Sequence, residues 1–285
     1  MGYLNLGCGS RYLKDWTNID FVSSSKHVAS HNLLEGIPHP DNQFKVVYHS
    51  HVLEHFEKND ATAFIKECHR VLAPGGILRV VVPDLEQIAK QYLAYLERAL
   101  EQPSDLNHSN YEWSVIEMYD QTVRNFPGGE MGKLWSRPEL LNENVIANRM
   151  GQEFLKFREN RAHASASTKK PLRPKKPKSK RNLPKSWKEK LASCLLGEPR
   201  LTEYLELGKF RKGGEIHQWM YDRYSLSKLL EQAGFDRVEQ KTADSSDIDQ
   251  WDIFKSLDIE NGNIRKPDSL FIEGIKSTAT SGVAP

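Results

Sequence analysis

The chain has 285 residues, of which 38% are hydrophobic and 9% aromatic, so it can bury a core although its mean hydropathy is low. No run of 18 or more apolar residues occurs, which argues against a membrane-spanning helix. The three cysteines, Cys8, Cys68 and Cys194, lack the paired spacing of a disulfide framework or a structural zinc site. We therefore expect a protein of a reducing compartment, the cytoplasm.

The net charge of +2 hides a strong asymmetry. Residues 169–190 contain eleven Lys and Arg side chains and one acid, Glu189, which gives a local charge of +10. Since the whole chain carries +2, the rest carries −8, so a basic segment is attached to an acidic body. The segment 161–190 is rich first in Ala and Ser and then in Lys and Pro, and this composition predicts a low-complexity loop.

Strands and helices are predicted to alternate over the first 84 residues. Short apolar or β-branched runs indicate strands at 3–6, 17–21, 45–49 and 77–82. Apolar residues at helical spacing predict a helix at 61–72, capped by Asn59 or Asp60 and ended by Pro74-Gly75-Gly76. This order predicts an α/β fold with a Rossmann-like, mostly parallel sheet and flanking helices.

The pattern changes at residue 85. Residues 85–160 are predicted to form a helical insertion, which we expect to build the acceptor pocket. Regular structure returns near 215, with a helix that Ser225 caps and Gly234 ends, followed by strands at 235–241 and 269–276 that close the sheet. The predicted α/β domain thus combines residues 1–84 with 215–276, and 277–285 is a flexible tail.

A glycine turn follows the first strand. Gly7 and Gly9 flank Cys8, and small residues there let the backbone approach a ligand closely. Asp20 ends the next predicted strand, where a carboxylate can accept two hydrogen bonds from a ribose diol. The other interpretation is a plain turn with a surface Asp. The lack of a third glycine argues against a dinucleotide pyrophosphate site.

Five motifs follow one another in the order and spacing of a known family. They are Leu6-Gly7-Cys8-Gly9, Trp16-Thr17-Asn18-Ile19-Asp20, residues 38–47, His51-Val52-Leu53-Glu54-His55, and Leu72-Ala73-Pro74-Gly75-Gly76. In these motifs the chain resembles the class I S-adenosylmethionine-dependent methyltransferases, closely over 3–84 and loosely over 215–276. Residues 78–85 and 217–222 more closely resemble the small methyltransferases found among polysaccharide and cell-surface glycan biosynthesis proteins.

The resemblance implies S-adenosylmethionine as the cofactor and a set of residues that bind it. These residues are Gly7, Cys8, Gly9, Asp20, Asn32, Leu33, Ser50 and His51. Asn32 stands where many relatives have an Asp that meets the adenine amino group, so it can accept that hydrogen bond only without charge. Only ten residues, 7–16, join the first two strands, so the usual first helix must be short or irregular.

The candidate catalytic residues are His51, Asp84 and His217, with Asp222 beside them. A base with a pKa near neutrality assists a hydroxyl nucleophile, and His51 follows a strand at the ligand-binding edge of the sheet. Structural roles remain open: His51 can line the cofactor, Asp84 can cap a helix and Asp222 can belong to a turn. His49, His51 and His55 suggest a metal site only superficially, because no acid or cysteine accompanies them at a standard spacing, and we predict none.

The predicted reaction is methyl transfer to a hydroxyl of a small molecule or glycan. Two alternatives stay open, namely an RNA or protein methyltransferase anchored by the basic segment, and a methyltransferase-fold scaffold without turnover. The basic segment itself can be a solvated loop, or it can contact anionic lipids at about 1 kcal/mol per basic residue. Nucleic acid is the weaker interpretation, because Trp187 is the only aromatic residue in 169–190.

Overall fold

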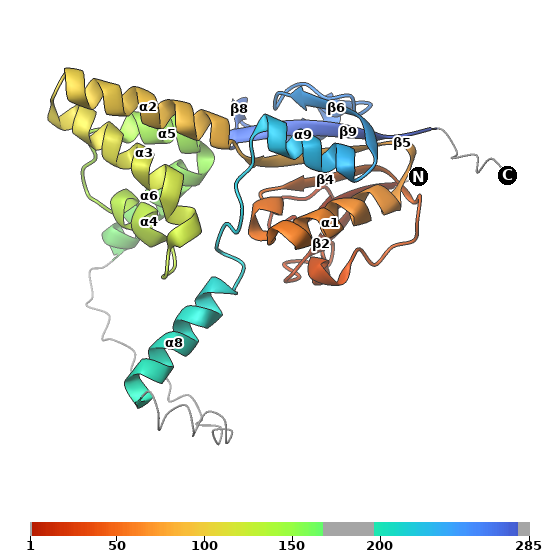
Figure 1. The fold of residues 1–285 in the computed structure, drawn as a ribbon, viewed down its shortest axis with the longest axis horizontal. Helices are drawn as coiled ribbons and strands as arrows, with labels where there is room; N and C mark the ends of the chain where they lie inside the picture. The colour runs from red at the N-terminus through yellow and green to blue at the C-terminus, as the bar shows by residue number, and fades with distance from the viewer. Residues whose placement is uncertain (1, 168–196, 279–285) are drawn as a thin grey trace.

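A seven-stranded sheet forms the centre of the computed structural model, which describes residues 2–167 and 197–278 (Figure 1). In spatial order the strands are β3 (Ala29–Ser30), β2 (Thr17–Asp20), β1 (Gly2–Leu6), β4 (Phe44–Ser50), β5 (Leu72–Pro83), β9 (Ser269–Lys276) and β6 (Phe235–Lys241). The first five are parallel, while β9 runs antiparallel to both β5 and β6. The predicted Rossmann-like, mostly parallel sheet is confirmed.

The two faces of the sheet carry separate cores because alternate residues of a strand point to opposite sides. In β4, Val47 joins the core beneath α1 (Lys58–Val71) and α9 (Arg223–Gln232), which lie on the same face in Figure 1. Val46 and Tyr48 join the opposite core. That second face is covered by α10 (Trp251–Phe254), η3 (Lys255–Leu257) and the short hairpin of β7 (Ile259–Glu260) and β8 (Asn263–Ile264).

Two predicted helix caps were wrong by a few residues. The N-cap of α1 is Glu57, because the chain leaves its extended conformation there and not at Asn59 or Asp60. Asp222 caps α9, and Ser225 is its partner in a reciprocal capping box. Residues 74–76 also lie inside β5 and do not end the helix, because α1 has already ended at Val71.

The connection from β1 to β2 contains no helix, in agreement with the short spacing seen in the sequence. It is held by backbone hydrogen bonds instead. Gly7 N and Cys8 N both donate to the Ile19 carbonyl oxygen, at 2.8 and 3.3 Å. The glycine turn is thereby fixed against the end of β2.

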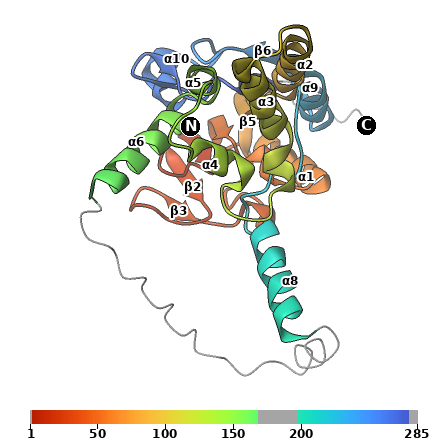
Figure 2. The same cartoon turned by 90° about the vertical axis from the view of Figure 1, so that its left-hand side faces the viewer.

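Five helices follow β5 and pack beside the sheet as a unit with its own core (Figures 1 and 2). They are α2 (Leu85–Glu101), α3 (Asp105–Val123), α4 (Gly129–Trp135), α5 (Glu143–Met150) and α6 (Gln152–Ser167). The short helix η2 (Leu53–His55), which follows β4, lines a cavity together with α4. Trp113, Ile146 and Phe154 are fully buried among them. Since α6 continues to Ser167, residues 161–167 are helical and not the predicted loop.

The segment before the sheet resumes contains α8 (Glu198–Arg211), which projects from the body in both views. The basic residues 169–190 and the tail 279–285 lie outside the described residues, so the predictions made for them remain predictions. Within 2–167 and 197–278, no helix is both long and apolar enough to cross a bilayer.

Candidate functional site

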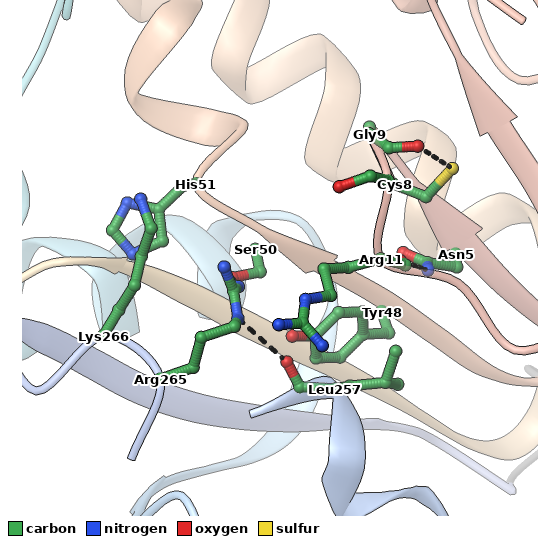
Figure 3. A pocket seen from close by; sticks show the side chains of 12 residues that line it. Asn5, Cys8, Gly9, Arg11, Tyr48, Ser50, His51, Leu257, Arg265 and Lys266 are labelled. Carbon is green, nitrogen blue, oxygen red and sulfur yellow. Dashed lines mark hydrogen bonds between the residues drawn. The ribbon is translucent and has the colours of Figure 1, made fainter. Parts of the chain in front are cut away.

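Two adjacent cavities lie at the carboxyl ends of the parallel strands. The chain leaves β1 toward β2 on one side, while β4 pairs on the other, so a topological switch point lies between β1 and β4. The first cavity, of about 220 Å³, opens there (Figure 3). It is lined by Asn5, Gly7, Cys8, Gly9, Ser10, Arg11, Tyr48, Ser50, His51, Leu257, Arg265 and Lys266.

The glycine turn forms one wall of the first cavity. Gly7 and Gly9 adopt left-handed backbone conformations, with φ of 62° and 54°. The Gly9 N–H donates to Asp20 Oδ2 at 2.7 Å, so the carboxylate stands directly beside the turn. A side chain at Gly9 would meet no atom within 4 Å, so this backbone borders open space.

The two glycines provide a matched pair of substitutions. A Cβ at Gly7 would lie 2.3 Å from Val52 Cγ2, so Gly7→Ala should add overpacking of about 1–3 kcal/mol to a left-handed strain of about 1–2 kcal/mol. Gly9→Ala should cost only the strain. Urea denaturation of both variants measures the difference, and equal losses of unfolding free energy would contradict this account.

Three of the residues implied to bind the cofactor, Asp20, Asn32 and Leu33, do not line the first cavity, although Asp20 lies beside its glycine turn. Asn32 caps η1 (Leu33–Glu35), where its side-chain oxygen accepts from Leu34 N at 3.2 Å, and Leu33 packs against the core of the α1 face. Cys8 does line the cavity. Burial raises the pKa of its thiol to about 11, so it remains protonated at neutral pH and is no nucleophile.

His51 stands where the two cavities meet. It follows β4 in a left-handed conformation with φ of 54°, which turns its side chain away from the strand direction. Its Nε2 lies 2.8 Å from Ser269 Oγ, and its Nδ1 lies 3.2 Å from Glu54 Oε1. Burial, aided by the positive charges of Lys266 and Arg265, lowers the pKa of His51 well below its usual value. The ring is therefore neutral at neutral pH.

The second cavity, of about 410 Å³, lies between the sheet edge and the helical unit. Its lining comes from the strand end, from α3, α4 and α6, and from the return segment: His51, Glu54, His55, Gln121, Arg124, Gly128, Met131, Gly132, Trp135, Glu153, Phe157, Glu215, His217 and Lys266. His217 is thus brought to the site from more than 160 residues away. Its backbone N–H donates to the Gln121 carbonyl oxygen, which anchors it there.

Asp84 and Asp222 are not brought to either cavity. Asp84 is the N-cap of α2, and its carboxylate accepts from the N–H groups of Glu86 and Gln87. Asp222 caps α9. Because both carboxylates are used to satisfy free N–H groups at helix starts, Asp84 is corrected from a candidate base to a structural cap.

Sequence reasoning missed Glu54 as a site residue. Its side chain is fully buried in the lining of the second cavity, and burial raises the pKa of its carboxyl to about 8. The sequence signal for Glu54 is the pair Glu54-His55 directly after two apolar residues. The start of an exposed helix explains such a polar pair equally well, so the pair alone does not indicate a site residue.

Residues 4–80 match the methyltransferase domain family. The chain is 27% identical over 120 residues to the uncharacterized protein YafE of Escherichia coli strain K12, a match that covers 42% of this chain and 49% of YafE. It thus spans about half the length of that curated relative.

Among the solved structures to which the chain is similar, two are described as methyltransferases. One is a SAM-dependent methyltransferase from Archaeoglobus fulgidus, 11% identical, with 96% of this chain and 85% of that chain covered at a TM-score of 0.37. The other is a putative methyltransferase from Bacillus halodurans, 13% identical, with 97% and 92% covered at a TM-score of 0.34.

The first cavity fits a nucleoside cofactor by its own residues. The open space beside Gly9 would be filled by a Cβ, and the adjacent Asp20 carboxylate can accept from a ribose diol. The buried side chains of Tyr48 and Leu257 also line this cavity. These features agree with the match of residues 4–80 to the methyltransferase domain family and support S-adenosylmethionine as the cofactor.

Proposed function

We propose that the chain transfers a methyl group from S-adenosylmethionine to a hydroxyl of a small molecule or glycan held in the second cavity. The observation that carries this proposal is the shared wall of the two cavities, since His51 and Lys266 line both. An acceptor in one cavity and a cofactor in the other would therefore meet at His51. Such positioning of two reactants contributes on the order of 7–11 kcal/mol to lowering a barrier.

The cofactor, when bound, supplies an electrophilic methyl group. The residues of this chain orient the two reactants and handle the proton that the acceptor hydroxyl loses. The neutral His51 ring takes that proton, and the Ser269 hydroxyl at Nε2 orients the ring.

The composition of the second cavity favours a polyhydroxylated acceptor. Trp135 offers an aromatic surface, and Gln121, Glu153 and Glu215 offer amide and carboxylate groups. Two of these carboxylates are held in place: Glu215 Oε1 accepts from Arg124 at 3.0 Å, and Glu153 pairs with Lys266 at 3.0 Å. An aromatic face with a few fixed polar groups suits a sugar ring better than a purely apolar molecule.

Calorimetric titration with S-adenosylhomocysteine tests the cofactor half of this proposal. The wild type should bind saturably, and Asp20→Ala should weaken binding at least about tenfold, because a hydrogen bond to a charged group contributes about 1.5–3 kcal/mol. Asp15→Ala, which removes an exposed acid from the same β1–β2 connection, should bind like the wild type. A folded wild type that binds no S-adenosylhomocysteine would refute the proposal and favour a scaffold without turnover.

A further inference from the structure

We infer that Glu54, His55 and His217 bind one divalent transition-metal ion in the wall of the second cavity. One ligand atom from each side chain lies within 4.8 Å of the other two. The three residues come from η2 and from the return segment, and all three line the cavity. Bonds of about 2.0–2.2 Å to a single ion would bring these atoms closer to one another by rotation of the side chains.

The backbone holds the two segments of the site together. The Glu54 carbonyl oxygen accepts from Gln218 N at 2.7 Å and from Trp219 N at 3.2 Å. The His55 and His217 rings meet edge to face, with their centroids 4.9 Å apart. The folded chain therefore places the three ligands before any ion binds, which lowers the entropy cost of binding.

Glu54 supplies the strongest reason for a cation at this position. Its side chain is fully buried, and neither carboxylate oxygen accepts a hydrogen bond from the residues that the structure describes. His51 Nδ1 approaches Oε1 at 3.2 Å without the alignment of a hydrogen bond. Buried carboxylates are otherwise paired or coordinate a metal, and a second oxygen remains for an ion beside His51.

Both histidines have one ring nitrogen occupied and one available. His55 Nδ1 donates to the Ile216 carbonyl oxygen at 3.2 Å, which leaves Nε2 with a lone pair. His217 Nε2 lies 3.3 Å from the Gln121 amide nitrogen, and its Nδ1 has no hydrogen-bond partner among the described residues. Exchanging the oxygen and nitrogen of that amide, which occupy equivalent positions, lets His217 Nε2 donate to the amide oxygen and leaves Nδ1 with a lone pair for the ion. Metal-binding histidines are oriented by this kind of second contact to a carbonyl or amide oxygen.

The ligand set determines which ions fit. Two imidazoles and one carboxylate suit Zn²⁺ and Mn²⁺, Fe²⁺ or Co²⁺, whereas Mg²⁺ and Ca²⁺ prefer oxygen ligands throughout. Three protein ligands leave coordination positions open toward the cavity, as in catalytic sites. On the proposed function, on which this role rests, an acceptor hydroxyl would occupy one of them and lose its proton more readily next to His51.

Titration of the chelator-treated full chain with Co²⁺ and Zn²⁺ tests the site. We expect one equivalent of Zn²⁺ by calorimetry and visible absorption bands of Co²⁺ that excess Zn²⁺ displaces. Glu54→Gln and His217→Gln should each lower the affinity at least about 10-fold, and Gln121→Ala should lower it about 10–100-fold as the loss of an orienting contact. Glu130→Gln, which changes an exposed acid of α4 outside both the ligand set and the cavity lining, should bind like the wild type.

Two results would overturn the inference. The first is a folded wild type that binds neither ion at one equivalent, and the second is binding that Glu54→Gln and His217→Gln leave unchanged while circular dichroism shows both variants folded. The wild-type Co²⁺ spectrum decides the matter if a variant does not fold. S-adenosylhomocysteine binding in the same samples reports on the first cavity, so failure of the metal site and failure of the proposed function are distinguished.

Discussion

Replacing His51 by Asn should lower the rate of methyl transfer by about 10²–10⁴-fold, the usual contribution of a general base. The structure explains why this residue is a sensitive position: it lines both cavities, and Ser269 Oγ lies within hydrogen-bond distance of its Nε2. Asn is the substitution of choice because it tolerates the left-handed conformation that His51 adopts. The fold should therefore survive while the base is lost.

Single-turnover transfer of a labelled methyl group to an acceptor from a hydroxyl-compound screen measures this effect. His108→Asn is the matched control, since His108 is exposed on α3 and lines neither cavity. The control should transfer at the wild-type rate. If His51→Asn also retains the wild-type rate, with S-adenosylhomocysteine still bound, His51 serves only as a wall of the cavities and the base lies elsewhere.

The sheet could be predicted from the sequence because its signals are local. Strand β6 was predicted at 235–241 and β9 at 269–276, with the bounds that the structure has, since β-branched and apolar runs bounded by turn residues are short-range features. The glycine turn and Asp20 were likewise predicted in the right relation, because both end neighbouring strands. Element ends were less predictable, as the caps of α1 and α9 show.

The second cavity could not be predicted, because it depends on contacts between distant segments. His217 meets His55 only after the return segment binds to the Glu54 backbone, and nothing local in the sequence reports this contact. His49 and His51 do not share a face, for a local reason. Strand β4 ends at Ser50, and the positive φ of His51 breaks the alternation, so His49 points into the core against Phe64.

Arg79→Met should lower the free energy of unfolding by about 3–5 kcal/mol, the cost of leaving buried charges without their partner. Arg79 is fully buried in β5, where it pairs with Asp258 at 2.9 Å and with Glu273 at 2.8 Å. It also donates to the backbone carbonyl oxygens of Thr242 and Ser245, and its guanidinium stacks on an aromatic ring, that of Trp251, 4.3 Å from the centroid. None of these partners is near Arg79 in the sequence, so its buried ion-pair network could not be predicted from the strand in which it lies.

Urea denaturation of Arg79→Met beside Arg237→Met measures that cost. Arg237 also has two acidic partners, Asp247 and Glu239, but its side chain is 57% exposed, so its loss should cost no more than about 1 kcal/mol. Because Arg79 ties residues 242–258 to the sheet, its loss should also loosen Leu257 in the wall of the first cavity and weaken S-adenosylhomocysteine binding. Equal destabilisation by the two substitutions would show that the buried network contributes no more than a surface ion pair.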